Sequence, residues 1–192
     1  MANPNVASGL KPVKNVSGAP QSGAARVYSV PSSDGTAIFI GDAVKLVGTG
    51  QTINGVTFAD VAQAASGDVM VGVVVGVLPD TRDSLTYRAA STQRLLLVVD
   101  DPDALFEIQE DSVGGSLAAN DLGQNASLIV ASGSTVTGLS GTMLDSSTHA
   151  TTNTLDLKIV AFVNRPDNDI GTNAKWHVRI NRHAYANQIA GV

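Results

Sequence analysis

The stretch VVDDPDALFEIQEDS, residues 98–112, gathers six carboxyl groups into fifteen residues. Clustered carboxylates can bind a divalent cation or transfer protons, so this stretch is the first candidate for chemistry. Asp100, Asp101 and Asp103 follow an apolar run. An Asp-x-Asp pattern at the end of a strand can hold Mg²⁺ or Mn²⁺ together with a phosphorylated substrate.

The spacing of these carboxyl groups argues against a single active site. The alternation in ALFEIQE predicts a strand with Phe106 and Ile108 on one face. At about 3.3 Å per residue, this strand separates the turn aspartates from Glu110 and Asp111 by roughly 20 Å. Pro102 favours an ordinary solvated turn, and no glycine-rich phosphate-binding motif lies nearby. We therefore predict no catalytic, cofactor-binding or metal-binding residue in this stretch.

The other residue types that carry chemistry form no recognisable pattern. The three histidines, His149, His177 and His183, lack the His-Glu-x-x-His spacing of zinc enzymes, and no Gly-x-Ser-x-Gly nucleophile motif is present. The segment RPDNDIG lacks the spacing and the final glutamate of a calcium-binding loop. The chain is therefore expected not to be an enzyme and to need no cofactor.

Composition and charge exclude further classes of function. The net charge is −5 and no run of basic residues exists, which argues against a nucleic-acid-binding protein. There are no cysteines, so disulfides and thiolate-ligated metals are absent. The N-terminus has no secretory signal pattern, and the most apolar run, residues 69–78, is about half as long as a bilayer span. We expect neither a nucleic acid nor a membrane as a partner.

The elements that position these residues are predicted to be strands. Only 4% of the residues are aromatic, so Val, Ile, Leu and Ala must supply most of the core, with Gly, Ser, Thr, Asn and Asp in the turns. Asn54-Gly55 predicts a two-residue hairpin turn. A short helix is expected at most within residues 116–126, and the polar stretch 133–154 is expected to form an exposed hairpin or loop. The predicted fold is all-β, a small β-barrel or β-sandwich of about eight to ten strands with at most one or two short helices.

The N-terminal segment differs in composition from the rest of the chain, which suggests a division at residue 27. Residues 1–27 are rich in Pro, Gly, Ser and Asn and are expected to form an extended N-terminal arm, either a flexible terminus or a strap that orders on a partner. Residues 28–192 are expected to form the β-rich body. The candidate contact residues of the arm are Val6, Leu10, Pro12, Val13 and Val16.

The last predicted strand supplies the remaining candidates. In AKWHVRIN the residues Trp176 and Val178 fall on one face, and Lys175, His177 and Arg179 fall on the other. One face is expected to enter the core. The other would present basic or titratable groups to a binding partner.

Several stretches taken together resemble a known family. YRAAST, DDPDALFEIQEDSVGG, STVTGLSGTMLDSST and FVNRPDNDIGTNAKWHVRIN are similar to sequences of structural cement, or capsid decoration, proteins of tailed bacteriophage heads, and the resemblance runs from about Lys11 to Asn181. It implies a non-enzymatic protein, made in the host cytoplasm, that binds the outer surface of the virion head. The implied partner is a major capsid protein of the HK97-type fold, whose neighbouring subunits the protein would link. The resemblance carries no motif that assigns individual contacts.

Three alternatives remain at this level. The protein could be a tail or neck component of the virion, a surface carbohydrate-binding module, or an enzyme that uses Asp100, Asp101 and Asp103 with a divalent metal. A homo-oligomer, dimer or trimer, is compatible with the decoration function.

Overall fold

The computed structural model describes residues 3–187, and the prediction of an all-β protein with at most short helices is confirmed. The ends of both expected segments, residues 1–2 and 188–192, lie outside the described residues. The elements are β1 (Lys11–Asn15), β2 (Arg26–Val30), β3 (Ala43–Ile53), β4 (Val56–Gln63), β5 (Gly72–Val77), β6 (Arg94–Val99), β7 (Ala104–Gln109), the 3₁₀ helix η1 (Ala119–Asp121), β8 (Asn125–Ala126), β9 (Leu128–Ile129), β10 (Met143–Leu144), β11 (Leu157–Phe162) and β12 (Lys175–Ile180).

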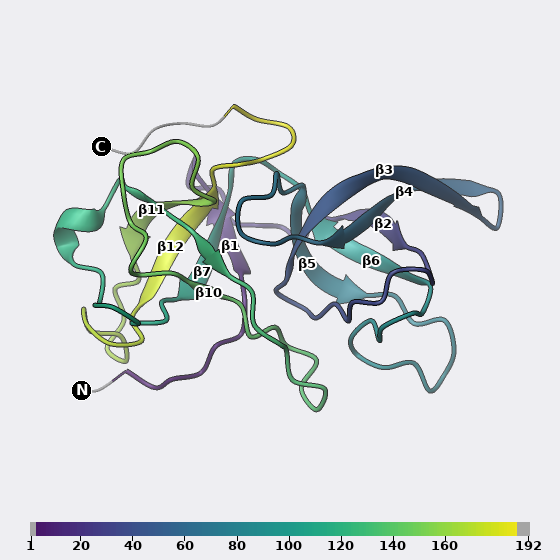
Figure 1. The fold of residues 1–192 in the computed structure, drawn as a ribbon, viewed down its shortest axis with the longest axis horizontal. Coiled ribbons are helices and arrows are strands. Elements are labelled where there is room, and N and C mark those ends of the chain that lie inside the picture. Colours follow the sequence, from purple (N-terminus) through teal and green to yellow (C-terminus); the bar gives the residue numbers. More distant parts are fainter. Residues whose placement is uncertain (1–2, 188–192) are drawn as a thin grey trace.

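Five of these strands close into a barrel in the order β2-β4-β3-β5-β6 (Figure 1). Closure at one seam depends on a single parallel pairing between Ser29 of β2 and Asp60 of β4. The interior is filled mainly by β-branched and aliphatic side chains, as the composition predicts. Its buried residues are Tyr28, Val30, Ile38, Val44, Val61, Val71, Val74, Leu96 and Val98.

The other strands build an antiparallel five-stranded sheet beside the barrel, in the order β1-β7-β12-β11-β8 (Figure 1). Val178 pairs with Phe106 and Trp176 pairs with Ile108, and all four side chains are buried on one face. The alternation expected for the last strand is therefore confirmed. This core also contains residues of the barrel strands such as Ala43 and Val73, so the sheet packs against the barrel wall, and the barrel interior forms a second, separate apolar cluster.

The Asn54-Gly55 turn joins β3 and β4 as the sequence predicts. Both residues have positive φ, 51° and 81°, as a type I′ turn requires, and Ile53 pairs directly with Val56. The outer half of this hairpin extends beyond the barrel (Figure 1).

The N-terminal segment is not separate from the body. β1 pairs with β7, and Leu10 is 1% exposed within the core, so Leu10 is buried in its own molecule and cannot anchor the chain to a partner. Gly9 has a φ of 69°, and a Cβ there would lie 2.5 Å from the carbonyl oxygen of Gly41. The close approach of these two glycines brings residues 9–15 into the sheet. The expectation for Leu10 is corrected because its apolar side chain fills a core position in line with β1.

The polar segment 133–154, expected as an exposed hairpin or loop, is partly buried. Ser140 and Thr142 donate to Asp42 at 2.5 and 3.3 Å, and Ser146 donates to Asp111 at 2.9 Å. The buried carboxylate of Asp42 and the half-buried carboxylate of Asp111 need donors, and these hydroxyl groups supply them. The polarity of the segment predicted exposure, and the sequence pattern could not reveal its acceptors because Asp42 and Asp111 lie far away in the chain.

The short helix expected within residues 116–126 is present as η1, and the apolar run 69–78 contains β5. A Cβ on Gly72 would lie 2.2 Å from the carbonyl oxygen of Val99, so this glycine permits the close packing of β5 against β6. No helix within residues 3–187 has the length and apolar character needed to span a bilayer.

Candidate functional site

The carboxylates of residues 98–112 are distributed among separate environments. Asp100 forms an ion pair with Arg26 at 3.2 Å and accepts a hydrogen bond from the hydroxyl of Tyr28 at 2.8 Å. Asp103 pairs with Arg179 at 3.3 Å. Asp101 accepts a hydrogen bond from the main-chain N–H of Asp103 at 2.8 Å, as in an Asx turn. The turn was expected to be solvated, whereas these contacts tie it to β2 and β12.

Among the carboxylates of this stretch, that of Glu110 is fully buried, with 0% exposure. Its carboxylate accepts hydrogen bonds from the indole N–H of Trp176 at 3.0 Å, the main-chain N–H of Leu117 at 3.1 Å and the hydroxyl of Ser112 at 2.9 Å. Burial raises the pKa of Glu110, and these donors only partly oppose the rise. Glu110 therefore fixes the end of β7 to β12 and to the following loop.

We expect Glu110→Gln to stabilise the protein at neutral pH by on the order of 1 kcal/mol. The amide oxygen can accept from Trp176 and Leu117, and the amide N–H₂ can donate to the oxygen of Ser112, so each contact can be kept with the direction of the Ser112 hydrogen bond reversed. The pKa of Glu110 is higher in the folded state than in the unfolded state. The stability that its protonated carboxyl contributes is therefore fully present below the unfolded-state pKa, and it is lost as the pH rises through the folded-state pKa.

The free energy of unfolding of both proteins, measured by denaturant titration across pH 4 to 8, tests this expectation. The advantage of the Gln variant should be smallest in acid and should grow with pH until the carboxyl of Glu110 is ionised. A constant difference across the series would contradict the role assigned to burial.

The outer face of the five-stranded sheet is the candidate site, because it carries all three predicted residues of the last strand. Cross-strand partners share a face, so Glu107 lies beside His177, and Gln109 beside Lys175. Leu105 lies between Arg179 on β12 and Lys14 on β1. We call this surface the basic face and define it by Lys11, Lys14, Glu107, Arg165, Lys175, His177 and Arg179.

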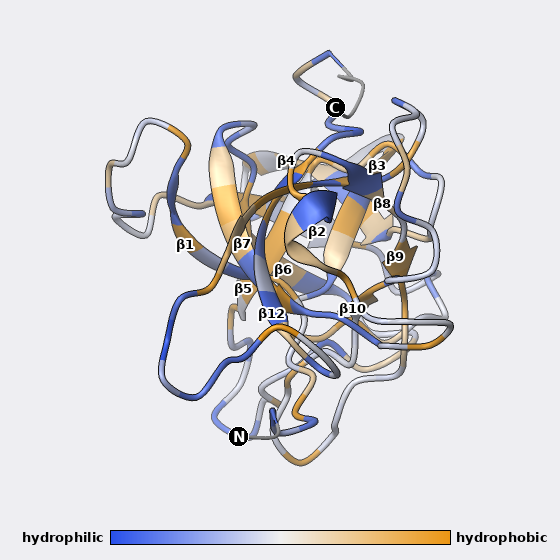
Figure 2. Ribbon diagram, turned by 90° about the vertical axis from the view of Figure 1, so that its left-hand side faces the viewer, coloured by the Kyte–Doolittle hydropathy of each residue, from blue (hydrophilic) through white to orange (hydrophobic). Residues whose placement is uncertain are grey.

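A bulge in β1 brings both of its lysines onto the basic face. Lys11 pairs with Glu107 and Lys14 pairs with Leu105, and the register shifts between Pro12 and Lys14. Residues three apart on a regular strand would point to opposite faces, and one extra residue restores the same side. Figure 2 shows β1 beside β7 at the border of the sheet. Alternation along the sequence could not reveal this grouping.

Ion pairs neutralise only part of the charge on the basic face. Arg165 makes two hydrogen-bonded contacts with Glu107, at 2.8 and 3.1 Å, and Arg179 pairs with Asp103. Within residues 3–187, Lys11, Lys14 and Lys175 form no ion pair. Three positive charges are therefore uncompensated on one face of a chain whose net charge is −5.

His177 lies half-buried in the middle of this face. Burial lowers the pKa of its imidazole, the positive charges of Lys14 and Arg165 lower it further, and Glu107 opposes them. The side chain therefore favours its neutral form near pH 7. It adds hydrogen-bonding capacity to the face without adding a fourth free positive charge.

The remaining predicted contact residues lie along the N-terminal segment. Val6, Val13 and Val16 are 60%, 38% and 50% exposed, whereas Pro12 is half-buried within β1, where it pairs with the core residue Phe106. Val6 is held by its main-chain N–H, which donates to the side chain of Gln109 at 2.9 Å. These valines thus lie next to the basic face and extend it with apolar surface.

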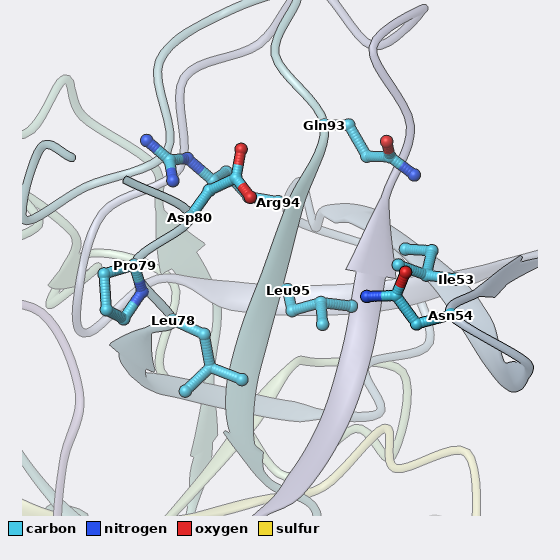
Figure 3. A pocket seen from close by; sticks show the side chains of 8 residues that line it. All are labelled: Ile53, Asn54, Leu78, Pro79, Asp80, Gln93, Arg94 and Leu95. Atoms are coloured by element: carbon cyan, nitrogen blue, oxygen red, sulfur yellow. The ribbon is translucent and has the colours of Figure 1, made fainter. Parts of the chain in front are cut away.

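The groove in Figure 3 lies at one end of the barrel and has a volume of about 360 Å³. In Figure 3, Leu95 lies between the hairpin tip, represented by Ile53 and Asn54, and the polar side chains of Asp80 and Arg94, and Leu78 lies below them. Pro79 and Gln93 complete its lining. In the described part of the chain, no three His, Asp or Glu side chains are placed to bind one metal ion.

Trp176 cannot serve as a platform for a sugar ring. Its side chain is 0% exposed, packs edge-on against Phe162 with ring centroids 5.1 Å apart, and donates to Glu110. The carbohydrate-binding alternative would need exposed aromatic rings, and the single tryptophan of the chain is used in the core.

Comparisons of this chain with protein-family models, with curated proteins and with solved structures found no match.

Proposed function

We propose that the protein is a non-enzymatic capsid decoration protein, which binds the outer surface of an assembled phage head and stabilises it by bridging major capsid protein subunits. The observation that supports this proposal best is the basic face, where Lys11, Lys14 and Lys175 stand without ion-pair partners in residues 3–187. A broad, rigid sheet face suits a protein surface as its partner. The resemblance of the sequence to structural cement proteins points to the same class of function.

The physical advantage of such a protein lies in mass action. A ligand that binds only the assembled shell stabilises that state, and contacts with two or more subunits raise the effective concentration of each further contact. An acidic patch on the capsid protein would complement the three free lysines. Electrostatic complementarity of this kind mainly speeds association and selects the partner.

Co-sedimentation with empty heads, assembled from the HK97-type capsid protein encoded with this chain, tests the proposal. We expect the triple variant Lys11→Glu, Lys14→Glu, Lys175→Glu to bind at least about tenfold more weakly than the wild type, and added salt to weaken wild-type binding. Arg82→Glu is the matched control, because Arg82 is exposed in the loop between β5 and β6, away from the face.

Two results would overturn the proposal: wild-type protein that stays in the supernatant, or a triple variant that saturates heads as the wild type does.

Deletion of residues 1–27 is a poor substitute for these variants. It would remove β1 and the buried Leu10, and the body would lose an edge of its sheet. Copies per particle, counted by quantitative mass spectrometry, would separate a lattice coat from a tail or neck component.

A further inference from the structure

The outer half of the β3–β4 hairpin leaves one strand edge without a neighbour. β3 pairs with β5 only through Ala43 and Val44. Beyond them, residues 46–50 are all exposed, and within residues 3–187 no main-chain hydrogen bond joins residues 46–53 to any element except β4. The opposite edge of the hairpin, on β4, is next to β2 in the barrel. The free edge is therefore that of β3.

The main-chain groups on this edge point outward at defined positions. In an antiparallel pair closed by a two-residue turn, Ile53 exchanges hydrogen bonds with Val56, and Gln51 does so with Phe58. The N–H and C=O groups of Thr52 and Gly50 then point away from β4. The run from Gly50 to Ile53 pairs without a register shift, and the irregularity in β3 lies between Leu46 and Gly50.

The side chains of the hairpin lack the usual protection of an exposed edge. Natural edge strands carry lysine, proline or inward-pointing charges that prevent pairing with other chains. From residue 46 to residue 59 there is no charged residue and no proline. Leu46, Val47 and Val56 are 39%, 42% and 54% exposed. Such an edge favours the addition of another strand.

We propose that the partner of this edge is the β3 edge of a second copy of the chain, in a two-fold dimer. A two-fold axis places identical residues of antiparallel strands opposite or near one another, so an edge that carried charge would repel its own copy. The uncharged run from Leu46 to Ala59 avoids that cost in a chain whose net charge is −5. The projection of the hairpin from the barrel keeps the two acidic bodies apart (Figure 1).

Dimerisation would also serve the proposed function, although it does not depend on it. The hairpin lies in the barrel half of the molecule, and the basic face lies on the five-stranded sheet. A dimer would present two basic faces at a fixed separation, and two linked sites bind a repeating lattice more tightly than one.

Sedimentation velocity of the full chain over a concentration series tests the dimer without any capsid. We expect a reversible monomer–dimer equilibrium for the wild type. Thr52→Pro removes an outward N–H that the hairpin itself does not use, and the two-fold symmetry doubles the loss, so the dissociation constant should rise roughly tenfold or more. Thr52→Ala is the control, because it loses the same contact with the hydroxyl of Thr57 and keeps the N–H.

Thr52→Lys keeps the main chain intact and places two like charges across the symmetric pair, so it should weaken the dimer, less so at high salt. It provides a second readout if Thr52→Pro lowers the unfolding temperature. A wild-type chain that is monomeric at every concentration, a trimer, or a dimer unaffected by Thr52→Lys would overturn the inference. Binding to empty heads, measured separately, tests the proposed function. Failure of the dimer and failure of head binding can therefore be distinguished.

Discussion

Trp176→Ala is expected to lower the free energy of unfolding by about 3–5 kcal/mol, the range for removing a large aromatic side chain from a core. Trp176 has 0% exposure at the centre of the five-stranded sheet, and its neighbour Phe162 packs against its ring. The substitution also takes a hydrogen-bond donor from Glu110, whose carboxylate is buried. Both effects act on the same strand pair, β7 and β12.

Trp176→Phe separates these two effects. It keeps most of the apolar volume and loses the indole N–H, so it should cost about 1–3 kcal/mol. Urea titration followed by far-UV circular dichroism measures both variants. If the two variants lost the same stability, packing would contribute nothing beyond the hydrogen bond, and the description of Trp176 as the centre of the core would be wrong.

Arg88→Ala is expected to destabilise the protein by a similar amount, about 3–5 kcal/mol. The Arg88 side chain is 0% exposed. Its guanidinium donates to the carbonyl oxygens of Pro31, Asp34, Thr36 and Thr92, and the nitrogen–oxygen distances to Pro31, Asp34 and Thr92 are each 2.8 Å. The substitution would leave these carbonyls without their donor and the Asp34 carboxylate, 3.5 Å away, without its counter-ion.

Arg88→Lys tests whether the shape of the guanidinium is needed in addition to its positive charge. Lysine keeps the positive charge, but it has one nitrogen and cannot reach carbonyl groups on several sides. We expect it to recover only part of the stability lost in Arg88→Ala, as measured by thermal unfolding. A lysine variant as stable as the wild type would show that charge alone, and not the fork of donors, organises the loop between β2 and β3.

Local patterns in the sequence predicted the local structure well. The alternation around Trp176 and Phe106 and the Asn54-Gly55 turn depend on residues close together in the chain, and the structure confirms both. The low aromatic content and the excess of β-branched residues correctly indicated an all-β fold. These features could be predicted because strand period and turn chemistry are properties of a few consecutive residues.

The surroundings of single polar residues could not be predicted in this way. Arg88 lies in the long segment between β5 and β6, and its acceptors are more than fifty residues away except for Thr92. Ser140 lies in a stretch whose polarity indicated exposure, yet it is buried against Asp42. In both cases the partner belongs to a distant segment, which local composition does not reveal.

The sequence by itself determined that this protein is built of strands, where one hairpin turns, and that Lys175, His177 and Arg179 share a strand face. The tertiary structure decided what surrounds them. Pairing of β1 with β7, across about ninety residues, added Lys11 and Lys14 to that face through a bulge and buried Leu10. The physical reason is that strand pairing is a long-range choice among many edges, and only the packed core selects one register.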